Sequence, residues 1–293
     1  MVVAFAAVTR ETQRMNVRNR GVRATRNGVL LVFALFFAVP LIWLVLAPTK
    51  TGYELATRSP FAFGSFGTLV RTWRQLDGFG LGTHLFRHWM ENSFLYCSSA
   101  TAIVLVTAIP AGYGLALGRF PGRRLILAAT IVAMTLPVTA LVLPTFLELA
   151  ALHVLGSPLT VVLPFAFFPF GVYLAYLYYA TALPTELFDA ARIDGCGEWA
   201  TFWRVALPLA KPVVALVLFF SFAADWTNFF LPYVVLGDSS QYPVEVGLSD
   251  MFIGGSKPVL ALAALIATVP LAIVYVVSQR AVIRGFVGGA TTG

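Results

Sequence analysis

Five neighbouring side chains inside an otherwise apolar run are the first group that could do chemistry. They are Ser221, Asp225, Trp226, Thr227 and Asn228. A carboxylate at the centre of a bilayer costs about 3 kcal/mol on insertion scales, so this one should face a polar cavity or a partner. Aromatic rings beside hydroxyl and amide groups suit a sugar, whose apolar faces stack while its hydroxyls form hydrogen bonds. The pattern predicts a solute path; the alternative is an outer-interface belt in which Trp226 and Asn228 only anchor the helix.

A second polar group follows the fourth hydrophobic run of the chain. Its charged side chains Glu186, Asp189 and Arg192 recur every three residues, which places them on one flank of a predicted helix. Thr185 is the expected N-cap of this helix, and Gly195 is its expected end at positive φ. A second short helix follows, with an apolar face made of Trp199, Phe202, Trp203 and Ala206. By shape alone, this segment is an amphipathic connector between two membrane spans.

The composition is that of a membrane protein. Hydrophobic residues make up 59% of the 293 residues and charged residues only 11%, unlike any ordinary soluble domain. A spanning helix needs about 20 mainly apolar residues, whereas a membrane β-barrel would show short alternating segments. Six long runs qualify as spans: residues 28–47, 93–117, 125–147, 159–180, 209–231 and 259–279. We therefore predict an all-α, polytopic membrane protein with six transmembrane helices.

The net charge of +7 does not require a nucleic-acid partner, because basic residues also set the orientation of membrane helices. Lysine and arginine near the spans favour the cytoplasmic side. With the N-terminus inside, most of the 20 basic residues lie on that side, while the two short outer loops hold only Lys257. Both termini and segment 186–212 are therefore expected to be cytoplasmic.

We expect two parts along the chain, a basic cytoplasmic tail over residues 1–27 and a membrane domain over residues 28–293. The tail carries six arginines and is expected to be disordered or to lie on the anionic inner leaflet. Connection 48–92 is too long for a simple turn, so part of it should form short helices at the outer face.

Two other residue groups could form a metal site or a disulfide, but each also has an interpretation without any such chemistry. His84 and His88 could share a helix face, but a metal site needs more ligands and only Glu91 is near, so a surface pair is expected. Cys97 and Cys196 are expected on opposite sides of the membrane, which excludes a disulfide between them.

Small residues and prolines within the spans suggest how the helices meet. Gly112, Gly114 and Gly118 are spaced for close approach of a second helix. Four prolines should interrupt the third and fourth spans, where freed carbonyl groups need a polar pathway or a neighbouring helix; simple packing kinks are the alternative. These prolines are Pro137, Pro144, Pro164 and Pro169.

The spacing within segment 186–212 resembles the cytoplasmic EAA loop of ABC-importer permeases. The matching positions are Asp189, Ala190, Ala191, Gly195, Val205, Leu207 and Pro208, with Asp189 standing where the family usually has Glu. In that family, the loop is a coupling helix that docks on the ATP-hydrolysing subunit. The resemblance implies a coupling loop over residues 184–208, and its coupling residues would be Glu186, Asp189, Ala190, Ala191, Asp194, Gly195, Leu207 and Pro208.

The polar run near residue 225 resembles the W-N-[DE]-F-x-x-P stretch of carbohydrate-importer permeases. Trp226, Phe229 and Pro232 match, while Thr227 and Asn228 stand where Asn and an acid are usual. With the C-terminal segment, this points to the maltose-type, binding-protein-dependent branch. The resemblance implies a permease subunit in the cytoplasmic membrane, surrounded by lipid and paired with a second permease, two ATPase subunits and an extracytoplasmic solute-binding protein.

Three function classes compete. The first is a transport subunit that is not itself an enzyme: the sequence has no GxxxxGK[ST] loop, so ATP and Mg²⁺ would be used by a partner and no cofactor by this chain. The second is a secondary transporter or channel, which usually needs repeated halves or several buried ionisable groups. The third, an intramembrane enzyme, lacks a GxSxG or HExxH motif. The first class, carrying a sugar or related polyol, fits best.

Overall fold

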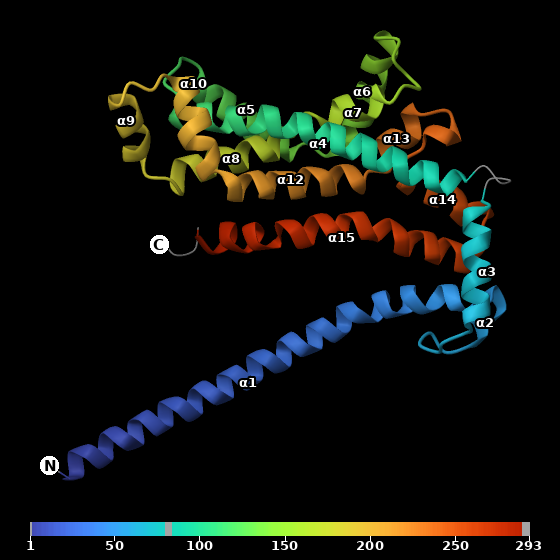
Figure 1. The fold of residues 1–293 in the computed structure, drawn as a ribbon, viewed down its shortest axis with the longest axis horizontal. Helices are drawn as coiled ribbons and strands as arrows, with labels where there is room; N and C mark the ends of the chain where they lie inside the picture. Colours follow the sequence, from blue (N-terminus) through green and yellow to red (C-terminus); the bar gives the residue numbers. More distant parts are fainter. Residues whose placement is uncertain (1, 80–83, 289–293) are drawn as a thin grey trace. The chain divides into compact units, whose positions relative to one another are not determined.

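A computed structural model describes residues 2–79 and 84–288, and Figure 1 shows their arrangement. Within these two ranges all regular secondary structure is helical, as the composition predicts. Contacts divide the chain into two units, one ending at Thr72 and the other beginning at Trp73.

The first unit is dominated by α1 (Val2–Leu46), which contains Pro40 and leads into the short 3₁₀ helix η1 (Ala47–Thr49). Residues 25–49 form a candidate span with a mean hydropathy of 3.0. The expectation that the basic tail is disordered is wrong for residues 2–27, which are helical. The physical reason is that no proline precedes Pro40, so the backbone hydrogen bonds of the helix can continue toward the N-terminus.

Short helices follow the first span, as expected: α2 (Gly52–Thr57) and α3 (Phe66–Asp77), which leads into the second unit. The side chain of Lys50 is buried, and its Nζ donates to the carbonyl oxygens of Ser59 and Pro60 at 2.9 and 2.8 Å. Thr51 and Glu54 form a reciprocal capping box at the start of α2. The backbone hydrogen bond from Thr51 lowers the pKa of the Glu54 carboxyl.

The second unit contains the following helices: α4 (Leu85–Leu117), α5 (Arg123–Thr135), α6 (Val138–Ala151), α7 (Leu159–Phe165), α8 (Pro169–Thr181), α9 (Thr185–Ile193), α10 (Glu198–Thr201), the π-helix η2 (Phe202–Ala206), α11 (Leu207–Leu209), α12 (Lys211–Trp226), α13 (Phe230–Val235), η3 (Ser239–Gln241), α14 (Val244–Gly254) and α15 (Lys257–Gly288). Helix α4 packs against α8 and α12, and α12 packs against α15, so that these long helices run side by side in Figure 1.

Four helical stretches in the described chain are long and apolar enough to cross a membrane: residues 25–49, 85–117, 159–181 and 257–280. Two bent pairs bring the number to as many as six. One pair, α5 and α6, bends by 105° next to Pro137, and the other bends by 76° between α11 and α12. Expected span 125–147 is therefore not one straight helix, because Pro137 lacks the N–H that would continue it. Expected span 209–231 is also interrupted, since α12 ends at Trp226.

The other three prolines behave differently from one another. Pro144 and Pro164 lie inside α6 and α7, whereas Pro169 begins α8. A proline at the first helical position loses no hydrogen bond, because that N–H has no partner within the helix. The interruption expected in the fourth span thus falls between α7 and α8.

One face of α4 holds the segment that joins α13 to α14. Trp89 Nε1 donates to the Ser239 carbonyl at 2.7 Å, and Tyr96 Oη donates to the Gln241 carbonyl at 3.0 Å. Between them, Asn92 Nδ2 donates to the carbonyls of Ser240 and Tyr242, and Ser93 Oγ accepts from the Val244 N–H at 2.7 Å. Because these α4 positions share one side of the helix, they satisfy the polar backbone of an irregular segment.

Close packing of α4 on α8 depends on Gly112. A Cβ atom at this position would collide with the Ala175 side chain and the Tyr176 backbone, whereas a Cβ at Gly114 would meet nothing within 4 Å. Of the glycines expected to allow a close helix approach, Gly112 does so at this contact and Gly114 does not.

We predict that Gly112→Val destabilises the protein by about 1–3 kcal/mol, because overpacking forces the two helices apart. Thermal unfolding of the purified protein in lipid measures the effect, with Gly114→Val as the matched control. Equal stability of both variants would contradict the close contact between α4 and α8.

Candidate functional site

The first helix of the expected coupling loop begins at Thr185, so both its start and its cap lie one residue earlier than predicted. Pro184 is the N-cap of α9, Thr185 is its first helical residue, and no side chain caps the helix. The predicted capping role of Thr185 is therefore wrong. The reason is that Pro184 is extended, with φ of −61° and ψ of 133°, so that the chain turns into the helix at Thr185.

The end of α9 is as predicted. Gly195 has φ of +82°, a conformation that glycine adopts without steric cost. The Cys196 N–H donates to the Ala191 carbonyl at 2.9 Å, and the Gly195 N–H donates to the Arg192 carbonyl at 3.0 Å. These two bonds form a Schellman motif, which fixes the direction in which the chain leaves α9.

Phe188 anchors α9 to the membrane helices. Its side chain is 1% exposed, and its ring meets that of Tyr113 on α4 at a centroid distance of 6.1 Å. The Tyr113 ring also contacts Tyr179 of α8 at 5.4 Å and Phe202 of η2 at 5.3 Å. Four aromatic rings thus join α9 and η2 to the ends of two long helices, so a displacement of α9 is resisted by packed rings.

A polar network supports the same connection. Arg192 lies between Asp189 and Glu198, with N–O distances of 3.0 and 3.1 Å, and Tyr113 Oη donates to the second oxygen of Glu198 at 3.3 Å. The hydrogen bond to Glu198 is the main reason why the pKa of the Arg192 guanidinium is raised. Because these ionic side chains are largely exposed to solvent, the network orients the loop more than it stabilises it.

The predicted coupling residues occupy two environments. Ala191 is buried and Leu207 is half-buried. Six others are exposed: Glu186, Asp189, Ala190, Asp194, Gly195 and Pro208. Ile193 is 86% exposed, so α9 presents an accessible surface with both acidic and apolar side chains.

The predicted apolar face of the second short helix is divided in the structure. Phe202 and Ala206 are buried, while Trp199 and Trp203 are exposed and stack on each other at 6.4 Å. In addition, η2 makes a π turn, in which the Leu207 N–H donates to the Phe202 carbonyl. A pattern based on 3.6 residues per turn does not anticipate this extra residue.

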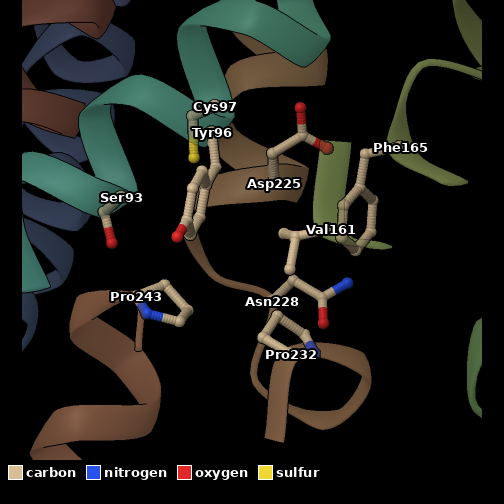
Figure 2. Close-up of a pocket in the computed structure, with 9 residues that line it drawn as sticks. All are labelled: Ser93, Tyr96, Cys97, Val161, Phe165, Asp225, Asn228, Pro232 and Pro243. Atoms are coloured by element: carbon tan, nitrogen blue, oxygen red, sulfur yellow. The ribbon is translucent and has the colours of Figure 1, made fainter. Parts of the chain in front are cut away.

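Only part of the predicted solute cluster comes together at a pocket. Asp225 and Asn228 line it with Tyr96 and Phe165, as Figure 2 shows. The remaining lining residues are Ser93, Cys97, Val161, Pro232 and Pro243. Nothing in the sequence links the lining residues of α4 and α7 to residue 225. They reach the pocket only because helices that are distant in the sequence pack together.

The other three members of the cluster point elsewhere. Trp226 is 3% exposed, stacks on Phe222 at 5.4 Å, and donates from Nε1 to the Ala267 carbonyl of α15 at 3.0 Å. Ser221 is fully buried and donates to the Leu218 carbonyl at 3.3 Å. Thr227 is exposed and bonds to the Ala223 carbonyl within its own helix.

The histidines and cysteines have ordinary surroundings. His84 lies 3.3 Å from Asp77, and His88 lies 3.7 Å from Glu91. Within residues 2–79 and 84–288, no three histidine, cysteine or acidic side chains are grouped to hold a metal ion. Cys97, which lines the pocket, is a free thiol.

Comparison with known proteins connects this geometry to a family. The family model described as "Binding-protein-dependent transport system inner membrane component" matches residues 108–287. The chain belongs to this family. The match runs from the second half of α4 through α15 and includes the whole predicted coupling loop, so the chain is a multi-pass permease subunit of the cell membrane.

Individual relatives agree with the family match. The chain is 31% identical to the arabinooligosaccharides transport system permease protein AraQ of Bacillus subtilis, over 72% of this chain and 76% of AraQ. It is 28% identical to the diacetylchitobiose uptake system permease protein NgcG of Streptomyces coelicolor, over 89% of this chain and 86% of NgcG. A crystal structure of a bacterial ABC transporter involved in alginate import shares the fold, with a TM-score of 0.74, 23% identity, and coverage of 88% and 96%.

For this permease, we predict that Trp226→Phe acts on stability. The substitution keeps a ring on Phe222 but removes the indole hydrogen bond to the Ala267 carbonyl of α15, which costs about 0.5–1.5 kcal/mol. Thermal unfolding in lipid measures the loss, and Thr227→Val, at an exposed position, is the control. An unchanged melting temperature for Trp226→Phe, together with an altered solute preference, would contradict this structural role.

Proposed function

We propose that this permease subunit carries a neutral sugar or related polyol into the cell, driven by ATP that a partner subunit hydrolyses. The observation that carries the proposal is the coupling loop: α9 is exposed on one side and anchored by Phe188 among the rings of α4, α8 and η2 on the other. A force applied to α9 would therefore reach two long helices through close-packed rings.

The proposed partners follow from the family and from the loop. Two ATPase subunits use ATP and Mg²⁺, one of them docking on residues 184–208 of this chain, and a second permease completes the membrane path. A solute-binding protein delivers the solute from outside, as the binding-protein dependence in the family description supports. In this arrangement, the chain itself holds no cofactor and contacts lipid but no nucleic acid.

The solute class rests on the relatives and on the pocket. Relatives are named for arabinooligosaccharides, diacetylchitobiose and, in UgpE of Yersinia pestis, sn-glycerol 3-phosphate. An anionic phosphate group would call for an arginine or lysine partner, and no basic side chain lines the pocket around Asp225 and Asn228 in the described chain. A neutral sugar suits these groups better.

A secondary transporter or channel remains the alternative. Such proteins couple transport to buried ionisable groups or repeated halves. Secondary transport does not need an anchored loop with an exposed acidic and apolar surface. Docking of an ATPase subunit does need such a loop. We also propose, from the charge distribution, that both termini and the coupling loop are cytoplasmic.

This orientation predicts that position 239 is outside the cell and Cys196 inside. Ser239→Cys in a chain without Cys97 and Cys196 should react with a membrane-impermeant thiol reagent added to intact cells. A chain that keeps Cys196 alone should react only after the membrane is permeabilised. The reverse result would overturn the orientation.

Coupling predicts that Gly195→Val reduces the ATPase stimulation by loaded binding protein while the permease still inserts into the membrane. A β-branched residue at positive φ is strained by about 1–2 kcal/mol, so α9 and α10 should lose their relative direction and the ATPase should dock poorly. Glu186→Lys should act in the same sense, since it places a cation at the positive end of α9. The measurement is ATPase stimulation by loaded binding protein in the assembled importer in lipid, together with retention of each subunit.

Gly197→Val provides the matched control, because Gly197 has φ of −68° and open space around its Cα. It should keep stimulation close to that of the wild type. If Gly195→Val retains ATPase binding, stimulation and uptake, residues 184–208 are only a connector between two membrane helices.

A further inference from the structure

Helix α12 meets the segment before it at a sharp bend. Residues 198–209, made of α10, η2 and α11, lie at 76° to α12 (Figure 1). Helix α12 carries the long apolar run of this candidate span. Because α12 runs into the membrane, segment 198–209 turns away from the membrane axis and toward the membrane plane.

The bend also sets the height of segment 198–209 above the hydrocarbon. Lys211, the first residue of α12, is exposed and marks the boundary where the apolar run begins. Trp199 precedes Leu209 by ten residues, which is about 15 Å along a helix. With α12 along the membrane normal, the angle of 76° reduces this length to a height of about 4 Å. The headgroup layer is about 5–7 Å thick on each side, so the whole segment lies within it.

The two sides of segment 198–209 have different surroundings. Thr201, Phe202 and Ala206 are buried against the protein. On the other side, the Trp199 and Trp203 side chains are 71% and 58% exposed and stack on each other. Neither indole N–H donates to any residue that the structure describes. The segment therefore has one side held by protein and one side without a partner in this chain.

Tryptophan is the side chain best suited to the boundary between hydrocarbon and water, because its ring is apolar and its N–H is polar. On a helix that lies flat at this boundary, the rings can reach the ends of the acyl chains. The two N–H groups can then donate to carbonyl and phosphate oxygens of the lipid. In water, the same indole pair would leave a large apolar surface exposed.

Charge on the exposed side also matches a lipid surface. Arg204 and Lys211 are exposed, and within the described chain neither forms an ion pair. Such side chains attract the anionic phosphates of lipid headgroups. The carboxylate of Glu198, the acidic residue of the segment, is instead bound to Arg192 and Tyr113. The side that carries the indoles is therefore basic as well as aromatic.

We propose that segment 198–209 is a lipid-binding surface that lies in the headgroup layer. Trp199 and Trp203 insert at the edge of the hydrocarbon, and Arg204 and Lys211 bind phosphates of anionic lipids. The loop then has two faces with different occupants, since α9 stays available for the proposed ATPase while lipid covers the indoles. This inference rests on the membrane location of the chain and on the bend, and it does not need the proposed coupling to be correct.

Spin labels test which medium surrounds the indole positions. Trp199→Cys and Trp203→Cys are introduced singly into a chain with Cys97→Ala and Cys196→Ala, and Ile193→Cys on α9 is the matched control. Each chain is labelled with a nitroxide and assembled with its partner subunits in nanodiscs that contain phosphatidylglycerol. Electron paramagnetic resonance compares the collision rate with oxygen, which concentrates in lipid, and with neutral nickel ethylenediaminediacetate, which stays in water.

Labels at positions 199 and 203 should collide more often with oxygen than with the nickel complex. At position 193, oxygen should not exceed the nickel complex, whether an ATPase covers α9 or water reaches it. Failure of the proposed coupling would therefore leave the expected result at all three positions unchanged.

The contact with phosphate is tested in the chain labelled at position 203. Replacing phosphatidylglycerol by phosphatidylcholine should lower the ratio of oxygen to nickel collisions. Arg204→Gln should lower this ratio in phosphatidylglycerol and reduce its dependence on lipid charge. Arg124→Gln, which removes an exposed arginine at the start of α5, should keep that dependence.

Three results would overturn the lipid-binding surface. More collisions with nickel than with oxygen at positions 199 and 203 would place the indoles in water. Few collisions with either reagent would show that a protein, the ATPase or the second permease, covers them. A ratio that does not respond to lipid charge in the chain with Arg204 would exclude the bound phosphate.

Discussion

The contact between α4 and segment 239–244 is the interaction on which most of the membrane unit depends. Backbone groups outside a helix need hydrogen-bond partners wherever they are buried. Trp89, Asn92, Ser93 and Tyr96 supply these partners from one side of α4. Since this segment joins α13 to α14, its attachment allows α12 to end at Trp226 and leaves room for a pocket there.

The same helix also serves the opposite end of the unit. Near its C-terminus, α4 approaches α8 at Gly112 and presents Tyr113 to Phe188 and Phe202. One continuous helix, which contains a single proline, Pro110, thus reaches from the pocket to the proposed coupling loop. Both regions are therefore packed against the same rigid element.

Much of the fold and part of the site could be predicted from the sequence. Long apolar runs are sufficient to identify membrane helices, and Gly195 marks a helix end because few other residues adopt positive φ. The kink at Pro137 could be only partly anticipated, since tertiary packing decides how strongly a proline bends a helix. The π turn at Phe202 could not be anticipated, because a pattern of 3.6 residues per turn gives no sign of an extra residue. The neighbours of Asp225 in the pocket could not be predicted, because Tyr96 and Phe165 reach it only through the packing of distant helices.

The π turn of η2 has a consequence for how this part of the chain can change length. Such a turn accommodates one residue more than an α-helical turn. Removing one residue between Phe202 and Ala206 would restore a regular helix, whereas removing one from an ordinary turn elsewhere would rotate everything beyond it by about 100°. The surplus residue of η2 therefore lies beside the stacked indole pair Trp199 and Trp203, at the place in this segment where a one-residue deletion disturbs the helix least.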